Sequence, residues 1–170
     1  MSFIFRIFVS EKPTRTMDTT NLSVTKVAEA KITYKNPVKA SERVKITKSN
    51  DAYELLLANW NNGAIELYES FQILLLNKAN KVLGISLIGE GGVSGCVVDT
   101  KRVFTTALLA NCSSIILAHN HPSGNIQPSE ADRQITKKIH AAGALLDIAV
   151  LDHLIISAES HYSFADNGEL

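Results

Sequence analysis

Cysteine, net charge and long apolar runs are all scarce in this chain of 170 residues. Its cysteines are Cys96 and Cys112, and no C-x-x-C pair occurs, which excludes both a disulfide framework and a zinc finger built on thiolates. Free thiols are typical of a reducing compartment, so we expect a cytoplasmic protein. No run of about 18 apolar residues occurs, and we expect no membrane span. Because the formal net charge is zero, no overall basic field indicates nucleic acid.

Charge is nevertheless spread unevenly along the chain. Residues 1–50 carry ten Lys and Arg against four Asp and Glu, whereas residues 51–170 carry seven against thirteen. The stretch from Lys31 to Lys48 holds six basic residues and one acid. Such a stretch either packs on the acidic remainder of the chain or contacts phosphates. With Tyr34 as its one aromatic residue it is a poor platform for stacking bases, so we expect weak DNA binding at most.

The same stretch sets the expected domain boundary. We expect residues 1–48 to form an N-terminal extension and basic arm, and residues 49–170 to form one domain. The opening MSFIFRIFVS is apolar, but it lacks a basic n-region and a cleavage site and is a poor signal peptide. Met17 is a second candidate start, and residues 1–16 then have no role in the fold.

Hydrophobic spacing and turn residues predict alternating helices and strands. Asp99 is a typical N-cap for the helix that follows it, and Gly143 stands where a helix would end. The alternation predicts an α/β fold in which a mixed β-sheet is flanked by helices. We expect helices over residues 52–60, 64–70, 100–111 and 129–142, and strands over residues 30–35, 70–77, 81–88, 93–98, 113–120, 148–157 and 161–166.

The segment HNHPSGNIQPSEAD carries the main chemical signal. His119 and His121 are two residues apart at a strand end, so both imidazoles can point to the same side. Asp132 lies one turn after Ser129 at the start of a helix and can face the same pocket. Two imidazoles and one carboxylate, with a fourth position for water, form a catalytic zinc site that lowers the pKa of water towards ~7.

Simpler interpretations of these residues stay open. Histidines two residues apart are common in loops, and Ser129-x-x-Asp132 also matches a helix capping pattern with Asp in place of the usual Glu. An iron site can use the same ligand types, although the α/β pattern argues against the β-helix fold of most such oxygenases. The zinc deaminases need H-x-E and P-C-x-x-C, and neither motif is present.

The motif H-x-H-x7-S-x-x-D resembles the signature of the JAMM (MPN-type) metalloproteases. The segments IILAHNHPSGN, PSEAD and LLDIAVLDHLII resemble the RadC branch of that family, and the resemblance covers roughly residues 30–170. It implies a JAMM/MPN-like fold with the layering of cytidine deaminases. Many RadC-type chains carry an N-terminal helix-hairpin-helix-like region; none is recognisable here, so we expect a short, single-domain form.

The resemblance also implies a role for each site residue. His119, His121 and Asp132 would bind zinc, and Ser129 would hydrogen-bond the oxyanion of a tetrahedral intermediate or cap its helix. The family needs a glutamate before a core strand, and Glu69 matches this position as the general base. The alternatives for the base are, in order, Glu66 and Glu90.

Three further histidines have plainer explanations. In LDHLI, Asp152 and His153 look like residues of the RadC branch, and we expect His153 to pack in the core or to support a ligand. His140 and His161 are expected at the surface.

Taken together, these features predict a zinc-dependent hydrolase of amide or isopeptide bonds, acting on a peptide or isopeptide substrate. Two alternatives stay open. One is an accessory protein of DNA repair or mobile elements, which the history of the RadC name implies. The other is a module that binds zinc without turnover, against which the presence of Glu69 argues.

Overall fold

The computed structural model describes residues 7–10, 29–32, 36–61, 63–92 and 95–170. The chain divides into two compact units, Met1–Pro37 and Val38–Leu170. In the first unit, strand β1 (Ile7–Ser10) pairs antiparallel with strand β2 (Glu29–Ile32), and Ile7 lies opposite Ile32. Part of the strand predicted over residues 30–35 is therefore present, and its last residues lie outside the described ones.

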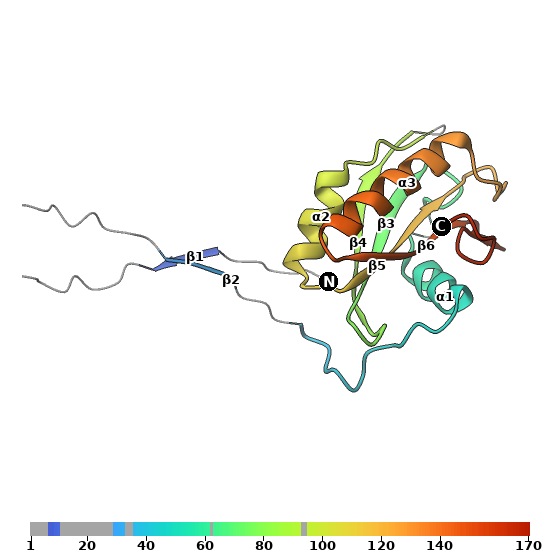
Figure 1. The fold of residues 1–170 in the computed structure, drawn as a ribbon. Coiled ribbons are helices and arrows are strands. Elements are labelled where there is room, and N and C mark those ends of the chain that lie inside the picture. The colour runs from blue at the N-terminus through green and yellow to red at the C-terminus, as the bar shows by residue number, and fades with distance from the viewer. Residues whose placement is uncertain (1–6, 11–28, 33–35, 62, 93–94) are drawn as a thin grey trace, which may run out of the picture. The chain divides into compact units, whose positions relative to one another are not determined.

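The second unit is built on a five-stranded mixed sheet with the strand order β4-β3-β5-β6-β7 (Figure 1). Strand β5 pairs antiparallel with β3 and parallel with β6, whereas the outer pairs β3–β4 and β6–β7 are antiparallel. The fully buried β3 and β5 are near-continuous apolar runs, as expected of strands covered on both faces. The strands are β3 (Ser70–Leu76), β4 (Val82–Glu90), β5 (Ser114–Asn120), β6 (Ala149–Ile156) and β7 (His161–Ser163).

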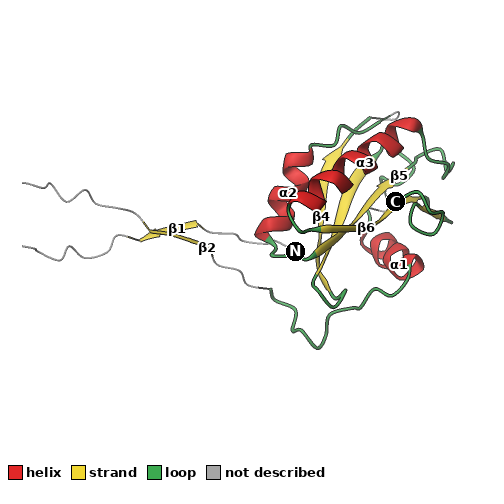
Figure 2. Ribbon diagram, viewed as in Figure 1, coloured by secondary structure: helices red, strands yellow, loops and turns green. Residues whose placement is uncertain are grey.

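Helices cover both faces of this sheet. Helix α1 (Ser49–Asn59) lies on one face, and α2 (Thr100–Leu109) and α3 (Glu130–Leu145) lie together on the other (Figure 2). Alternate residues of each strand feed two separate cores: Ile73 and Ile115 pack under α2 and α3, whereas Leu74 and Ile116 pack under α1. The predicted α/β fold with a mixed sheet flanked by helices is confirmed.

Several predicted elements differ from the observed ones. Residues 95–98 form no strand beyond one bridge between Gly92 and Gly95, so the strand predicted over residues 93–98 is wrong for the part that the structure describes. The predicted helix over residues 64–70 is a series of turns that leads into β3. Strand β7 ends at Ser163, before the predicted end of the strand at residue 166.

Helix α3 also runs past its predicted end at residue 142. It continues to Leu145, and Gly143 lies inside it. The left-handed residue after the helix is Asp147, with φ of 55°. Gly143 is instead required by close packing, because a Cβ there would lie 2.4 Å from the carbonyl oxygen of Ile148.

The second unit begins at Val38, before the boundary that we predicted between residues 48 and 49. Lys45 forms a β-bridge with Lys81, the Val82 amide donates to the carbonyl of Val44, and Ile46 is buried in the core beside α1. None of the helices within the described residues is long and apolar enough to cross a membrane. Cys96 and Cys112 are free thiols, and the cytoplasmic location inferred from them stays a prediction.

Candidate metal centre

The ends of β5 and α3 bring three side chains together. His119 is the last but one residue of β5, His121 follows the strand, and Asp132 lies in the first turn of α3. The His121 amide donates to the carbonyl of Ile156, which holds the chain beside β6 past the end of β5. One potential ligand atom from each of the three residues lies within 4.8 Å of the other two.

The contacts within this group are short. The Nε2 atoms of His119 and His121 are 3.1 Å apart, and Oδ1 of Asp132 lies 3.1 Å from Nε2 of His119. Nδ1 of His121 lies 2.5 Å from the carbonyl oxygen of Asn125. A carbonyl oxygen can only accept, so Nδ1 of His121 carries the hydrogen, and the neutral ring has its lone pair on Nε2, towards the group. Imidazole nitrogens and a carboxylate oxygen are donors that suit zinc, so these residues fit a zinc ion.

Glu69 approaches the same group from the start of β3. Phe71 lies opposite His119 in the sheet, and Glu69 precedes Phe71 by two residues, so its side chain leaves the backbone on the side of His119. Two backbone hydrogen bonds hold it: its amide donates to the carbonyl of Gly92, and its carbonyl accepts from the amide of Gly91.

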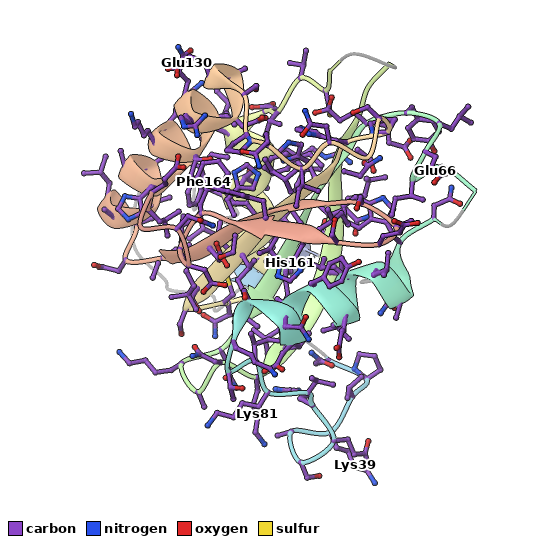
Figure 3. All side chains as sticks on the ribbon, turned by 90° about the vertical axis from the view of Figure 1, so that its right-hand side faces the viewer. Lys39, Glu66, Lys81, Glu130, His161 and Phe164 are labelled. Carbon is purple, nitrogen blue, oxygen red and sulfur yellow. The ribbon has the colours of Figure 1, made fainter. Side chains whose placement is uncertain are left out.

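The other two candidate glutamates point elsewhere. Glu66 lies exposed in the turns before β3, and its side chain points away from the sheet (Figure 3). Glu90 pairs with Ser70 in the sheet, so it leaves the sheet on the face opposite Phe71, and it accepts a hydrogen bond from the Tyr68 hydroxyl. The structure thus brings Glu69, and neither alternative, to the histidines.

Ser129 caps helix α3. Its hydroxyl donates to Oδ2 of Asp132 at 2.6 Å and accepts from the Asp132 amide, while the Ser129 amide also donates to Oδ2. This reciprocal arrangement is a capping box with Asp in place of Glu. Capping also orients the Asp132 carboxylate, because it ties up Oδ2 and leaves Oδ1 beside His119.

A pocket of about 460 Å³ opens over these residues. All five predicted site residues line it, and so does Cys96, which had no predicted role. Burial raises the pKa of the Cys96 thiol, and the nearby Glu69 carboxylate adds to the shift, so this thiol stays protonated at neutral pH. No described residue of the basic stretch Lys31–Lys48 lines the pocket, and weak DNA binding stays a prediction. The lining residues are Glu69, Phe71, Gly95, Cys96, Val98, His119, His121, Pro122, Ser123, Ser129, Ala131, Asp132 and Ile135.

Comparison with known proteins places this site in a family. The family model for the RadC-like JAB domain matches residues 46–169. The chain belongs to the RadC-like JAB domain family. The match contains all of the pocket-lining residues and confirms the resemblance carried by the H-x-H motif.

Relatives of this RadC-like JAB domain occur in several bacteria. It is 46% identical over 124 residues to a UPF0758 protein of Flavobacterium johnsoniae, across 73% of this chain and 53% of that protein. It is 42% identical over 102 residues to the UPF0758 protein YfjY of Escherichia coli, across 60% of this chain and 64% of that protein. The chain therefore spans about half to two thirds of the length of these relatives.

In this RadC-like JAB domain the pKa values of the Glu69 and Asp132 carboxyl groups are shifted in opposite directions. Burial raises the pKa of Glu69, although the nearby His119 and His121 oppose the shift. Burial also works to raise the pKa of Asp132, but the imidazole rings of His119 and His121 beside the carboxylate outweigh it and hold the pKa far below its usual range. Asp132 is thus ionised, as a metal ligand should be. The pKa of Glu69 is shifted upwards, in the direction of neutral pH, as suits an acid–base group.

Asn120 lies between the two histidines in the sequence, and we had assigned it no role. It is fully buried on the other face of β5, where its amide oxygen accepts from the amide and hydroxyl of Ser70. Its amide nitrogen donates to the carbonyls of Ile65 and Tyr68. These bonds hold the segment that delivers Glu69. A polar residue in an otherwise apolar strand was the available signal, but it does not reveal the partners.

The three remaining histidines behave differently from one another. His140 is exposed, as predicted. His161 is half-buried, so it lies only partly at the surface, and its ring stacks on Tyr53 of α1 at a centroid distance of 4.5 Å. His153 is fully buried, does not line the pocket, and contacts His119 from behind. This agrees with the expectation of a packing or supporting residue.

Proposed function

We propose that this RadC-like JAB domain is a zinc-dependent hydrolase that cleaves an amide or isopeptide bond. One observation carries the proposal: Glu69, with a raised pKa, shares a pocket with a His119–His121–Asp132 group that fits a zinc ion. A structural metal site is closed by protein ligands, whereas three ligands beside an open pocket leave a position for water.

Each residue then has a role. His119, His121 and Asp132 hold the zinc ion, which when bound supplies Lewis acidity and lowers the pKa of water. The Glu69 carboxylate takes the proton that water loses as its oxygen adds to the carbonyl carbon. It then gives this proton to the amine nitrogen as the carbon–nitrogen bond breaks, so Glu69 returns to its starting state. Ser129 lines the pocket, and once substrate is bound its single hydroxyl hydrogen would turn from Oδ2 of Asp132 to the oxyanion.

Metal analysis tests the ligand assignment. We expect about one zinc ion per chain in the purified protein and almost none in His119→Ala or His121→Ala. Asp132→Asn should bind more weakly, because an amide oxygen is an uncharged ligand. His140→Ala is the matched control, since that histidine is exposed. Equal zinc content in all of these proteins would rule the ligands out, and full metal content with lost stability in Asp132→Asn would leave Asp132 only its capping role.

Hydrolysis by Glu69→Gln tests the general base. The glutamine can hydrogen-bond to water but cannot take its proton, so we expect retained zinc and a loss of about 10²–10⁴-fold in turnover. Glu66→Gln and Glu90→Gln are the matched controls and should stay active. A panel of isopeptide-linked and extended peptides is the substrate.

Two outcomes would change the assignment. Turnover by Glu69→Gln at the wild-type rate would remove Glu69 as the base and leave the metal site intact. A zinc-loaded wild-type protein that cleaves no member of the panel would favour a metal-binding accessory module instead.

A further inference from the structure

A chain of buried hydrogen bonds runs behind the candidate metal centre, away from the pocket. Nδ1 of His119 lies 2.9 Å from Nε2 of His153, and Nδ1 of His153 lies 2.6 Å from the hydroxyl oxygen of Thr136. That hydroxyl also lies 2.5 Å from the backbone carbonyl oxygen of Asp132, one turn earlier in α3. His119, His153 and Thr136 are each at most 2% exposed, so water does not compete for these hydrogen bonds.

The donor and acceptor in each of these hydrogen bonds follow from the last acceptor in the chain, the backbone carbonyl of Asp132. The Asp132 carbonyl can only accept, so the single hydrogen of the Thr136 hydroxyl points to it. The hydroxyl oxygen then has only lone pairs for His153, and Nδ1 of His153 must carry a hydrogen. The Asp152 carboxylate accepts from the backbone amide of His153, but among the described residues no carboxylate hydrogen-bonds to its ring. A buried cation without an anionic partner is costly, so the ring is neutral and its Nε2 is bare. His119 must therefore donate from Nδ1.

We propose that Thr136 and His153 are positioning residues that fix His119 as its Nδ1–H tautomer and so present its Nε2 lone pair to the metal. The inference rests on the proposed metal site. Ligand histidines usually donate their other ring N–H to a carboxylate, a carbonyl or water. Here the acceptor is a second imidazole, whose own tautomer is fixed by a hydroxyl and, through it, by the backbone of Asp132.

The fixed tautomers determine which atoms the candidate ligands turn towards the pocket. The unprotonated Nε2 atoms of His119 and His121 then face each other at 3.1 Å. Nε2 of His119 also faces Oδ1 of Asp132 at 3.1 Å. Three electron-rich atoms at such distances repel one another unless a cation lies between them, either a metal ion or a proton on Nε2 of His121. The buried chain thus prepares the group for a cation before one binds, and it prevents His119 from relieving the repulsion by moving its own hydrogen to Nε2.

Histidine NMR on isotope-labelled protein tests the tautomers directly. We expect His153 to carry its hydrogen on Nδ1 in both the metal-free and the zinc-loaded protein, with a coupling across the hydrogen bond between the His119 and His153 rings. An Nε2–H tautomer or a protonated ring at His153 would overturn the proposal. The metal-free measurement needs neither zinc nor hydrolysis, so its result is separate from any failure of the proposed function.

Zinc affinity tests the effect on the metal. Thr136→Val removes the hydroxyl at nearly constant shape, and we expect it to weaken zinc binding about 10–100-fold. Thr136→Ser keeps the hydroxyl and should retain wild-type affinity. His153→Leu should bind zinc at least as weakly as Thr136→Val, whereas His153→Gln should recover part of the loss, because its amide can accept from His119 and donate to Thr136.

Thr106→Val is the matched control. The Thr106 hydroxyl makes the same bond to a carbonyl one turn earlier, that of Arg102 in α2, but contacts no histidine. It should leave zinc affinity and the histidine signals unchanged. Wild-type affinity and unchanged His119 and His153 signals in a folded Thr136→Val variant would show that the hydroxyl does not set the tautomer.

Discussion

Asn120 shows how much of this site depends on one buried amide. Its four hydrogen bonds use the full donor capacity of the side chain and connect the end of β5 to the segment before β3. We call these four hydrogen bonds the Asn120 clamp. Because neighbouring strand residues face opposite sides, the same strand end points His119 to the pocket and Asn120 to the clamp. These hydrogen bonds and the candidate metal ligands His119 and His121 are therefore built from adjacent residues.

Asn120→Ala should destabilise the metal-free protein by about 2–4 kcal/mol, because several backbone groups lose their partners in a buried site. Chemical denaturation measures the change. Asn59→Ala is the control: the Asn59 amide makes one exposed bond, to the carbonyl of Leu55, and its loss should cost less than about 0.5 kcal/mol. Equal effects of the two substitutions would show that the clamp adds nothing to stability.

At the scale of elements, an irregularity in β6 decides which side chains reach the site. Ile115 lies opposite Val150, but Ile116 lies opposite Asp152, so Leu151 is an extra residue in the strand. A bulge of this kind reverses the alternation of side chains beyond it. His153 consequently shares a face with Leu117 and His119 and packs under α3, where Thr136 meets it.

The end of α3 depends on a close contact with the strand that follows. Gly143→Ala should destabilise the protein by at least about 1 kcal/mol, although alanine is favoured over glycine in a helix by a similar amount. The added Cβ would lie 2.4 Å from the backbone oxygen of Ile148, which a side-chain movement cannot relieve. Thermal or chemical unfolding measures the net effect. Ala144→Gly calibrates helix propensity at an exposed neighbour, and a more stable Gly143→Ala protein would contradict the close contact.

At the scale of the whole molecule, the sheet holds its two helical layers together through polar as well as apolar contacts. His161 of β7 lies over α1 (Figure 3). Its ring stacks on Tyr53 of that helix, and the Tyr53 hydroxyl donates to the carbonyl of Ser157. On the other face, Arg133 of α3 forms an ion pair with Glu169 near the C-terminus. The C-terminal segment thus contacts both layers.

The His161 stack predicts a pH dependence of stability. Burial lowers the pKa of His161, although Asp152 and Asp166 oppose the shift. The unfolded chain therefore binds a proton on this residue at a higher pH than the folded chain does. This contribution to stability is present above the unfolded pKa of about 6.5 and is lost as the pH falls below it.

His161→Phe keeps an aromatic ring on Tyr53 but removes the titration. We expect its melting temperature to fall less than that of the wild type when the pH is lowered from about 7.5 to 5.5. The buried His153, whose pKa burial also lowers, contributes equally to both proteins and cancels in the comparison. Parallel pH profiles for the two proteins would remove His161 as a source of the dependence.

Local sequence signals were sufficient wherever one segment contains its own determinants. Asp99 caps α2 as predicted, because an N-cap depends on residues two or three positions away. The apolar runs of β3 and β5 identify buried strands, and the short spacings within HNHPSGNIQPSEAD place His119, His121 and Asp132 at one strand end and the helix start that follows. These signals were enough to predict the α/β fold and the candidate ligands.

Tertiary structure alone decided the features that depend on register and on contacts between distant segments. The choice of Glu69 over Glu66 and Glu90 follows from which residue of β3 lies opposite His119 and which lies opposite Glu90. The alignment of His153 behind His119 follows from the extra residue in β6, and the place of Gly143 inside α3 follows from the approach of Ile148. Pairing register and close approach are properties of two segments at once, so the pattern of either segment alone does not contain them.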